Sequence, residues 1–293
     1  MYMRGFDPPM FGSHLSIAGG LHHALLEAES FGMDTVQVFT KNQQQWKCTP
    51  LTDDAIALWS AHRRRLKFRK TVSHDSYLIN LASPDDRLWQ ASIDLFIEEL
   101  RRCVALEIPY LVTHPGSHTG SGEAPGLARV AEALDRAHEA VPADHVITCL
   151  EITAGQGSSL GYRLEHLAAI MDAVGQDRRL GVCLDTAHLF AAGYDFRGRK
   201  YGRFRKQLES IIGIKRVKVL HLNDSKKELG SRVDRHEHIG LGKIGKSGFI
   251  PFVRDPAFAA VPKILETPKA THPGGRPWDA INLCTLRAMA AKR

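Results

Sequence analysis

Residues able to bind a metal are concentrated in the stretch SRVDRHEHIG, residues 231–240, and in the stretch LHLND that precedes it. Imidazole and carboxylate groups are common ligands of zinc, manganese and iron. The candidate ligands in the two stretches are His221, Asp224, Asp234, His236, Glu237 and His238. A metal site also needs ligands that the fold brings to the same place, so the positions of His, Asp and Glu in the rest of the chain become decisive.

Eight short runs rich in β-branched residues alternate with helical patterns along the 293 residues. The runs lie near residue 12 and at residues 34–40, 70–76, 110–117, 146–153, 180–186, 217–224 and 262–267. This alternation predicts a closed parallel (β/α)8 barrel, or TIM barrel, that spans residues 1–293 as one α/β domain. An open doubly wound sheet is the competing arrangement, but SHLSIAGG after the first run matches the GxGxxG turn of such sheets poorly.

Helices are expected in the gaps between these runs and after the last one. Their patterns occupy residues 19–32, 51–66, 83–107, 124–141, 161–175, 203–214, 247–258 and 278–293. Thr52 is the expected N-cap of the second helix. Ser83 and Pro84 are expected at the cap and in the first turn of the third helix.

The other candidate ligands stand at or near the ends of the predicted strands. His74, His114, Glu151, Asp185, His221 and Glu266 end strands three to eight, His188 follows Asp185, and Asp234 and His236 lie in the loop after strand seven. In a barrel these strand ends form one face, where active sites of this fold lie. Clustered carboxylates repel one another unless cations offset their charge. Nine ligands exceed the three or four protein ligands of one zinc site, so two or three ions are expected.

Composition and charge exclude some classes of protein and permit others. No apolar run approaches the roughly 18 residues of a membrane helix, and the start MYMRGFDPPM has no signal-peptide pattern. The cytoplasm is therefore the expected compartment. The net charge of +7 permits a polyanionic partner, although the basic run RRRLKFRK, residues 63–70, is interpreted as a solvated helix end. The five cysteines form no CxxC and are expected to be reduced, with Cys103, Cys149 and Cys183 in the core.

Eight long stretches carry a resemblance to a known family. They are FTKNQQQW (39–46), HDSYLINLASP (74–84), HPGSH (114–118), EITAGQGSSLGYRLEHL (151–167), VCLDTAHLFAAGYD (182–195), HLNDSK (221–226), GSRVDRHEHIGLGKIG (230–245) and ILET (264–267). From about Gly12 to Thr267 the chain resembles the endonuclease IV family of apurinic/apyrimidinic (AP) endonucleases. The wider group of similar metal-binding barrels includes sugar isomerases and epimerases.

The resemblance implies a site for three zinc ions per chain, with manganese or iron as an alternative at one position. By position, His74 and His114 bind the first ion, and Glu151 bridges the first and second. The ligands of the second ion are completed by Asp185, His221 and Glu266, and the third ion is bound by His188, Asp234 and His236. Glu237, His238 and His14 are then expected beside the ligands and not among them.

The implied reaction is hydrolysis of the phosphodiester 5′ to an abasic site in double-stranded DNA, which leaves a 3′-hydroxyl and a 5′-deoxyribose phosphate. A metal-bridged hydroxide is the implied nucleophile, and Glu151 and Glu266 are the implied catalytic carboxylates. The implied DNA contacts are Asn42, Gln44, Gln45, Tyr77 and Leu78. A monomer that associates with the nucleoid through DNA is expected, with no nucleotide cofactor and no membrane partner.

Four positions depart from the family pattern, and two other functions stay open. Gln44, Ile152, Ala187 and Leu241 stand where the family often has Arg, Asn, Cys and Glu. One alternative is a metal-dependent sugar isomerase or epimerase, against which the ligand set for a third ion argues. The other is a protein that binds damaged DNA without turnover, against which the complete ligand set argues.

Overall fold

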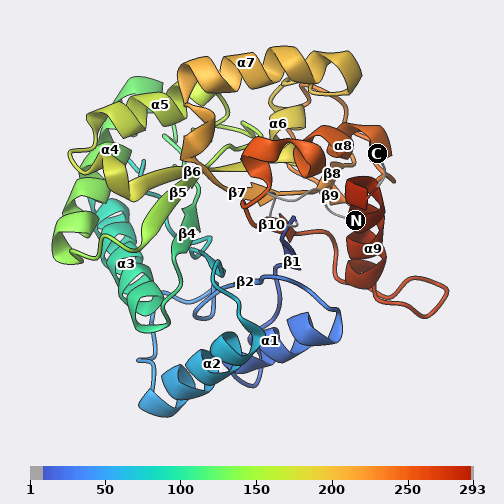
Figure 1. Cartoon of the computed structure of the whole chain (residues 1–293). Helices are drawn as coiled ribbons and strands as arrows, with labels where there is room; N and C mark the ends of the chain where they lie inside the picture. Colours follow the sequence, from blue (N-terminus) through green and yellow to red (C-terminus); the bar gives the residue numbers. More distant parts are fainter. Residues whose placement is uncertain (1–8, 292–293) are drawn as a thin grey trace.

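Eight parallel strands form a barrel that helices surround in the computed structural model, which describes residues 9–291 (Figure 1). Residues 1–8 and 292–293 lie outside the described part. The first range holds most of the start in which no signal-peptide pattern was expected, and the second holds the end of the predicted last helix. Neighbouring strands follow the order β1-β10-β7-β6-β5-β4-β3-β2. A parallel bridge between His14 and Gln37, with a 2.9 Å bond from Leu15 N to Gln37 O, closes the barrel between β1 and β2.

All eight predicted strand runs contain a strand of this barrel, although each strand is shorter than its run. The strands are β1 (Phe11–Ser13), β2 (Gln37–Val38), β3 (Val72–His74), β4 (Tyr110–Thr113), β5 (Ile147–Glu151), β6 (Leu180–Asp185), β7 (Val217–His221) and β10 (Lys263–Leu265). The prediction of a closed parallel barrel is therefore confirmed, and an open doubly wound sheet is excluded.

Helices cover the outside of the barrel, because each crossover between parallel strands must return the chain to the same end. They are α1 (Leu21–Ser30), α2 (Asp53–Leu66), α3 (Asp86–Ala105), α4 (Glu123–Ala140), α5 (Leu164–Ala173), α6 (Thr186–Ala191), α7 (Tyr201–Ile211), α8 (Lys246–Arg254) and α9 (Trp278–Ala291). The Thr52 side chain accepts a 3.2 Å bond from Ala55 N, which confirms the predicted cap of α2.

The predicted start of the third helix is wrong by two residues. Asp85 caps α3, and its carboxylate accepts a 2.9 Å bond from Leu88 N. Ser83 instead accepts a 3.2 Å bond from Asp85 N, too early in the chain to cap the helix. Two further elements were not predicted: the short helix α6, and a hairpin of β8 (Asp224–Ser225) with β9 (His236–Glu237).

Two apolar layers hold the barrel together. The larger one lies between the strands and the helices, and it includes outward residues such as Leu111, Leu150 and Leu184. The smaller one fills the barrel interior and consists of Val72, Val112, Cys149, Cys183, Val219 and Ile264. The three cysteines predicted in the core are buried and free.

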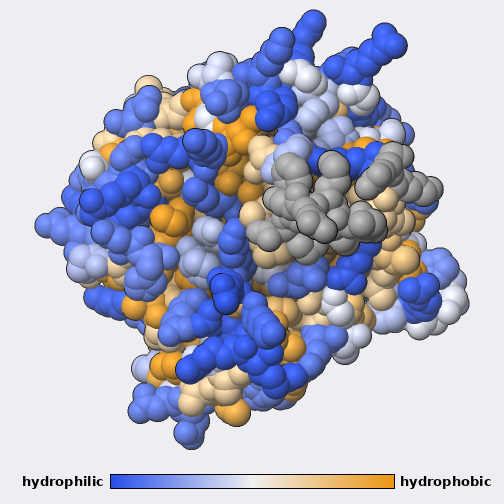
Figure 2. Space-filling model, in the orientation of Figure 1, coloured by the Kyte–Doolittle hydropathy of each residue, from blue (hydrophilic) through white to orange (hydrophobic). Residues whose placement is uncertain are grey.

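The surface is mostly hydrophilic on the side shown in Figure 2, with hydrophobic residues scattered in small groups. The basic run at residues 63–70 belongs to the end of α2 and the turn after it, as predicted. Arg63 pairs with Glu107, and Arg65 forms two 2.6 Å bonds with Glu29. Within residues 9–291 no helix is both long enough and apolar enough to cross a membrane.

Candidate metal centre

Strand periodicity brings six of the predicted ligands to one level of the barrel. Successive side chains of a strand point to opposite faces, so residues two apart share a face. Each interior apolar residue is followed two positions later by a predicted ligand. The pairs are Val72 and His74, Val112 and His114, Cys149 and Glu151, Cys183 and Asp185, Val219 and His221, and Ile264 and Glu266. The ligands therefore form the next layer inside the barrel, at its carboxyl end.

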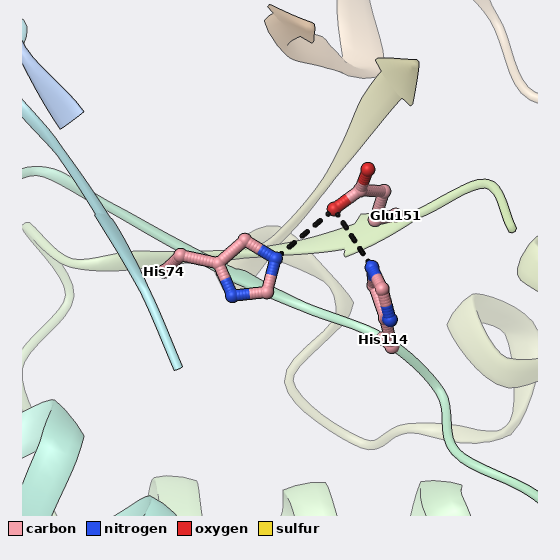
Figure 3. A group of neighbouring side chains, drawn as sticks. All are labelled: His74, His114 and Glu151. Atoms are coloured by element: carbon pink, nitrogen blue, oxygen red, sulfur yellow. Dashed lines mark hydrogen bonds and ion pairs between the residues drawn. The ribbon is translucent and has the colours of Figure 1, made fainter. Parts of the chain in front are cut away.

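The first group of neighbouring ligands consists of His74, His114 and Glu151 (Figure 3). His74 Nε2 and His114 Nε2 each lie 3.2 Å from Glu151 Oε2, and the two rings approach this oxygen from different strands. Glu151 is fully buried and His74 is nearly so, whereas His114 keeps 35% of its side chain exposed. One cation among these three atoms would replace the contacts drawn between them.

The second group shares Glu151 with the first and adds Asp185, His221 and Glu266. His221 Nδ1 lies 3.1 Å from Glu151 Oε1, 3.1 Å from Glu266 Oε2 and 3.9 Å from Asp185 Oδ2. The two oxygens of Glu151 thus face different groups. This is the arrangement that a carboxylate bridging two cations requires.

The third group lies where the loop after β7 folds over the barrel. Asp185, His188 and His236 have ligand atoms close together. Asp234 joins them, with Oδ2 3.1 Å from His188 Nε2 and Oδ1 3.3 Å from His236 Nε2. The hairpin β8–β9 places His236, and Asp234 N donates a 3.1 Å bond to Gln156 Oε1 of the Gly-rich segment 154–161.

The imidazole orientations fit a metal. His74 Nδ1 and His188 Nδ1 each lie 2.9 Å from a backbone carbonyl, of Asp75 and Ile152 respectively, so these nitrogens carry hydrogen and leave Nε2 as the free lone pair. Among the described residues, the buried Nε2 atoms of His188 and His236 have carboxylates beside them, above all Asp234, but no partner in the position of an ordinary hydrogen bond. Buried imidazole nitrogens without hydrogen bonds, next to carboxylates and without thiolate ligands, suit zinc or a similar divalent cation.

The pKa values show how strongly these opposite charges interact. Burial by itself disfavours a charged His74, but its hydrogen bond with Glu151 and the nearby carboxylates raise the pKa of His74 to about 9. Burial would also raise the pKa of Glu151, yet His221 and His114 hold it well below its usual range. Asp234 keeps 43% of its side chain exposed, and its partial burial is outweighed by its ion pair with His188, which lowers the pKa of Asp234 to about 2. Without cations, the nearby carboxylates therefore keep imidazoles such as that of His74 protonated. A metal ion that binds to these imidazoles would displace the protons.

The remaining His, Asp and Glu of the two opening stretches have structural contacts. Asp224 accepts 2.9 Å bonds from the backbone nitrogens of Gly240 and Ile244, which shapes the loop after β9. His238 stacks on Trp278, with ring centroids 3.8 Å apart, and Glu237 Oε1 accepts a bond from His238 N. His14 Nδ1 lies 3.3 Å from Glu266 Oε1 and belongs to none of the ligand groups, as expected.

Of the residues predicted to contact DNA, Tyr77 lies beside the metal centre, with its ring centroid 6.1 Å from that of His74. Tyr77 is 70% exposed and lines two hollows of about 510 and 280 Å³. The larger hollow also touches His236 and Glu266, and the smaller one touches His114, His188 and Asp234. Asn42, Gln44 and Gln45 are exposed in the preceding loop, which Ser76 holds through a 2.8 Å bond to Gln43 O; Leu78 is half-buried.

Sequence reasoning missed several residues that hold the ligands. Asn223 Nδ2 donates a 2.6 Å bond to Asp185 Oδ2, and Asn223 Oδ1 accepts a 2.7 Å bond from Glu266 N. Asp75 is buried beside His74, and burial raises its pKa to about 7. Cys183 lies near Glu151 and His221, but burial raises the pKa of its thiol and keeps it protonated. Asn223 and Asp75 each lie within two positions of a predicted ligand, which is the signal that could have found them.

The departures from the family pattern leave the ligands intact. Ile152 contributes its backbone carbonyl to His188, so this contact does not depend on the side chain. Ala187 is buried in α6, Leu241 is 59% exposed, and Gln44 is exposed. Gln44 and Ile152 lie in loops that border the hollows beside Tyr77, but the Ile152 side chain is buried whereas Gln44 is exposed.

Fold and site together define a TIM-barrel protein with a candidate metal centre at the carboxyl ends of its strands. Residues 25–284 match the family described as xylose isomerase-like TIM barrel. The "Probable endonuclease 4" of Chloroflexus aurantiacus is 48% identical over 282 residues, which cover 96% of this chain and 98% of that protein. The "Probable endonuclease 4" of Geobacter sulfurreducens is 44% identical over 283 residues, 96% of this chain and 95% of that protein.

Solved structures of two kinds of protein share the fold of this chain. Endonuclease IV from Thermus thermophilus superposes with a TM-score of 0.85 at 36% identity, covering 96% of this chain and 98% of that one. A D-tagatose 3-epimerase-like protein has a TM-score of 0.72 at 19% identity and covers 96% of each chain, a likeness of fold alone. The chain belongs to the endonuclease IV family.

Proposed function

We propose that this protein is a metal-dependent DNA repair endonuclease that hydrolyses the phosphodiester 5′ to an abasic site in duplex DNA. The observation that carries the proposal is the convergence of five imidazoles and four carboxylates in three groups that share Glu151 and Asp185. Open hollows adjoin these groups, and the relatives that match the whole chain are named endonucleases.

Three zinc ions per chain would be held by the three groups, with manganese or iron as an alternative at one of them. When bound, such cations lower the pKa of water from 15.7 to about 7 and offset the charge of the phosphate. No side-chain nucleophile is needed, because water attacks the phosphorus and the bond to the 3′-oxygen of the upstream nucleotide breaks. The departing 3′-oxygen takes up a proton, which leaves the 3′-hydroxyl and the 5′-deoxyribose phosphate.

Glu266 is the carboxylate that we assign to orienting the attacking water. His221 holds the pKa of Glu266 well below the usual range in spite of burial, so Glu266 stays ionised and accepts hydrogen bonds. Glu266 also lines the larger hollow, where substrate has access. Glu266→Gln should lose turnover to a greater extent than it loses metal; equal losses would leave Glu266 as a ligand only.

Tyr77 and the loop at residues 39–46 are assigned to recognition of the lesion. The exposed ring of Tyr77 borders both hollows, and it can enter the base stack where the abasic nucleotide leaves the helix. Asn42, Gln44, Gln45 and Leu78 would contact the DNA around it. We also propose that the protein acts as a monomer in the cytoplasm, since duplex DNA needs an open face.

An incision assay tests the proposal. The substrate is an end-labelled duplex with one tetrahydrofuran abasic analogue, which cannot undergo β-elimination. Cutting on the 5′ side with a 3′-hydroxyl product, abolished by prolonged chelation and restored by zinc, is the expected result. If zinc-loaded protein leaves this duplex intact but converts ketose sugars, the epimerase alternative replaces the proposal; tight binding without cutting would indicate a damage-binding protein.

A further inference from the structure

Two of the eight inward positions at the carboxyl end of the barrel are filled by polar residues that are not ligands. Each of the eight strands presents one such position. Six are the ligands described above, and the other two are His14 after β1 and Gln37 in β2. Gln37 is fully buried, and a buried amide is costly unless its hydrogen bonds are satisfied.

Gln37 contacts two ligands of the second group, His221 and Glu266, and also His14. Its Oε1 accepts a 2.8 Å bond from His221 Nε2. Its Nε2 donates a 2.6 Å bond to Glu266 Oε1 and a 2.9 Å bond to His14 Nδ1. The reverse orientation of the amide would press its oxygen against the Glu266 carboxylate, so electrostatics fixes which end faces which partner.

His221 differs from three other ligand histidines in the nitrogen that faces the centre. His74, His188 and His236 each direct Nδ1 at a backbone carbonyl, at 2.9, 2.9 and 3.2 Å, and present Nε2 to the carboxylates. His221 presents Nδ1, which lies 3.1 Å from both Glu151 Oε1 and Glu266 Oε2. Its outer nitrogen, Nε2, meets the Gln37 side chain.

This difference matters because a neutral imidazole binds a metal only through the nitrogen that lacks hydrogen. A backbone carbonyl cannot be removed by a side-chain change, and it fixes the tautomer of the other three. The tautomer of His221 is instead fixed by the amide oxygen of Gln37. This oxygen accepts a bond from Nε2–H, so the lone pair is on Nδ1.

We propose that Gln37 is a positioning residue of the second metal group, which fixes His221 in the tautomer that binds through Nδ1 and holds Glu266 through its amide nitrogen. The proposal rests on the metal centre of the proposed function but not on the reaction. Gln37 belongs to no stretch that carried the family resemblance, so motif reasoning gives it no role.

Two substitutions separate this role from packing. Gln37→Met keeps the length of the side chain and removes both hydrogen-bonding groups. Gln37→Glu restores an acceptor for His221 Nε2, but it places a carboxylate against Glu266. Asn80→Leu is the control, because Asn80 is a half-buried amide whose side chain bonds to backbone atoms of Ala82 and Ser117 and to no ligand.

The first readout is the tautomer of His221 in the zinc-loaded protein, observed by long-range ¹H–¹⁵N correlation of labelled histidine. The second is the chelator concentration that removes each zinc ion. In Gln37→Met the His221 Nε2–H signal should be lost or mixed, and one ion should bind about 10- to 100-fold more weakly while the others are unchanged. Gln37→Glu should retain the Nε2–H signal, and Asn80→Leu should change neither readout.

The proposal is overturned if Gln37→Met leaves the His221 tautomer and the release of zinc as in the unchanged protein. Equal weakening of all ions in Gln37→Met would also overturn it, since that indicates a general loss of packing. Neither readout uses DNA. A chain that loads zinc but does not cut abasic DNA would therefore refute the proposed function and leave this test intact.

Discussion

The two ends of the barrel both contain buried charged side chains, but they satisfy them in different ways. At the amino end, Lys263 donates to the carbonyls of Phe258 and Val261 at 2.5 and 3.0 Å, and Arg179 donates to those of His138 and Val141 at 2.8 Å each. At the carboxyl end, imidazoles and carboxylates face one another. Backbone carbonyls accept bonds from both cations without a metal, although Arg179 Nε and Nη2 have no partner among the described residues. The cluster at the other end needs protons or cations.

Buried charges that bond to backbone carbonyls are therefore interpreted as structural, and the facing imidazoles and carboxylates as functional. Substitutions at the carboxyl end should alter metal content and incision far more than folding. Substitutions at the amino end should alter the free energy of unfolding and leave metal content unchanged. The following predictions test this division.

The largest effect is expected for Glu151→Gln, because Glu151 faces two ligand groups at once. Zinc content should fall by more than one ion per chain, and the incision rate should fall by more than about 100-fold, the upper range for residues that only support ligands. Elemental analysis and the incision assay measure both. Glu99→Gln is the matched control, since Glu99 is a buried carboxyl of α3 outside the ligand groups. Normal zinc content in Glu151→Gln would contradict the bridging role expected for Glu151.

Asp234→Asn should have a smaller and more local effect, because Asp234 belongs to one group and lies in a loop. One ion should become easier to remove while the others stay bound, and incision should slow by about 10- to 100-fold. Chelator titration followed by elemental analysis gives the count. Glu237→Gln, on the same hairpin but paired with Lys226 at 4.0 Å, should match the unchanged protein. Loss of every ion in Asp234→Asn would show that the loop supports the whole centre.

Zinc affinity should fall as the pH is lowered below about 9, which is the pKa of His74 in the ion-free protein. Below this pKa zinc must displace a proton, so affinity should change by about tenfold per pH unit for each proton displaced. Competition with a chromophoric chelator between pH 7 and 9.5 measures this, after correction for the chelator's own protonation. A flat profile below pH 9 would mean that the imidazoles are neutral without metal.

Tyr77→Ala should weaken binding to an abasic duplex without changing zinc content. Stacking of an aromatic side chain on bases contributes about 1–3 kcal/mol, so the Kd should rise by about 5- to 150-fold. Fluorescence anisotropy with chelated, inactive protein measures Kd without turnover. Leu58→Ala is the control, because Leu58 is 45% exposed on the outer helix α2. An equal effect on an intact duplex would argue against a role in recognising the lesion.

Substitution of Lys263, at the amino end of the barrel, should change only the free energy of unfolding. Burial lowers the pKa of Lys263 to about 7, from 10.5 in an unfolded chain. Between these values the unfolded state binds more protons, so the free energy of unfolding should rise with pH, by at most about 1.4 kcal/mol per pH unit. Lys263→Met should lack this rise when both proteins are unfolded in urea between pH 7.5 and 9.5. Parallel profiles would show that Lys263 is not desolvated as described.

Much of this arrangement could be predicted from the sequence, for identifiable reasons. Period-two alternation placed His74, His114, Glu151, Asp185, His221 and Glu266 at strand ends, and the order of strands in a barrel then brings them together. Contacts that depend on tertiary geometry could not be read in this way. Gln37 meets ligands of other strands, and no local pattern sets it apart from ordinary polar residues. Asn223 and Asp75 stand within two positions of predicted ligands, but only the fold decides which residues they bond to.

The exact starts of some helices also depend on tertiary geometry and could not be predicted from local sequence. Ser83 and Asp85 are both good caps, and only the path of the chain into α3 decides between them. The short helix α6 begins directly after Asp185, whose carboxylate accepts a 2.9 Å bond from His188 N. A residue that is predicted as a strand-end ligand therefore also caps a helix, which sequence patterns treat as separate signals.

We propose that the three ligand groups together form a hydrolytic centre for abasic DNA. The most direct test of this proposal is to titrate the ion-free protein with zinc and to record bound zinc and incision of the tetrahydrofuran duplex in the same samples. We expect three ions to bind per chain, with incision rising to its maximum only as the last group fills. Full incision with one ion bound, or none with all groups filled, would contradict the account.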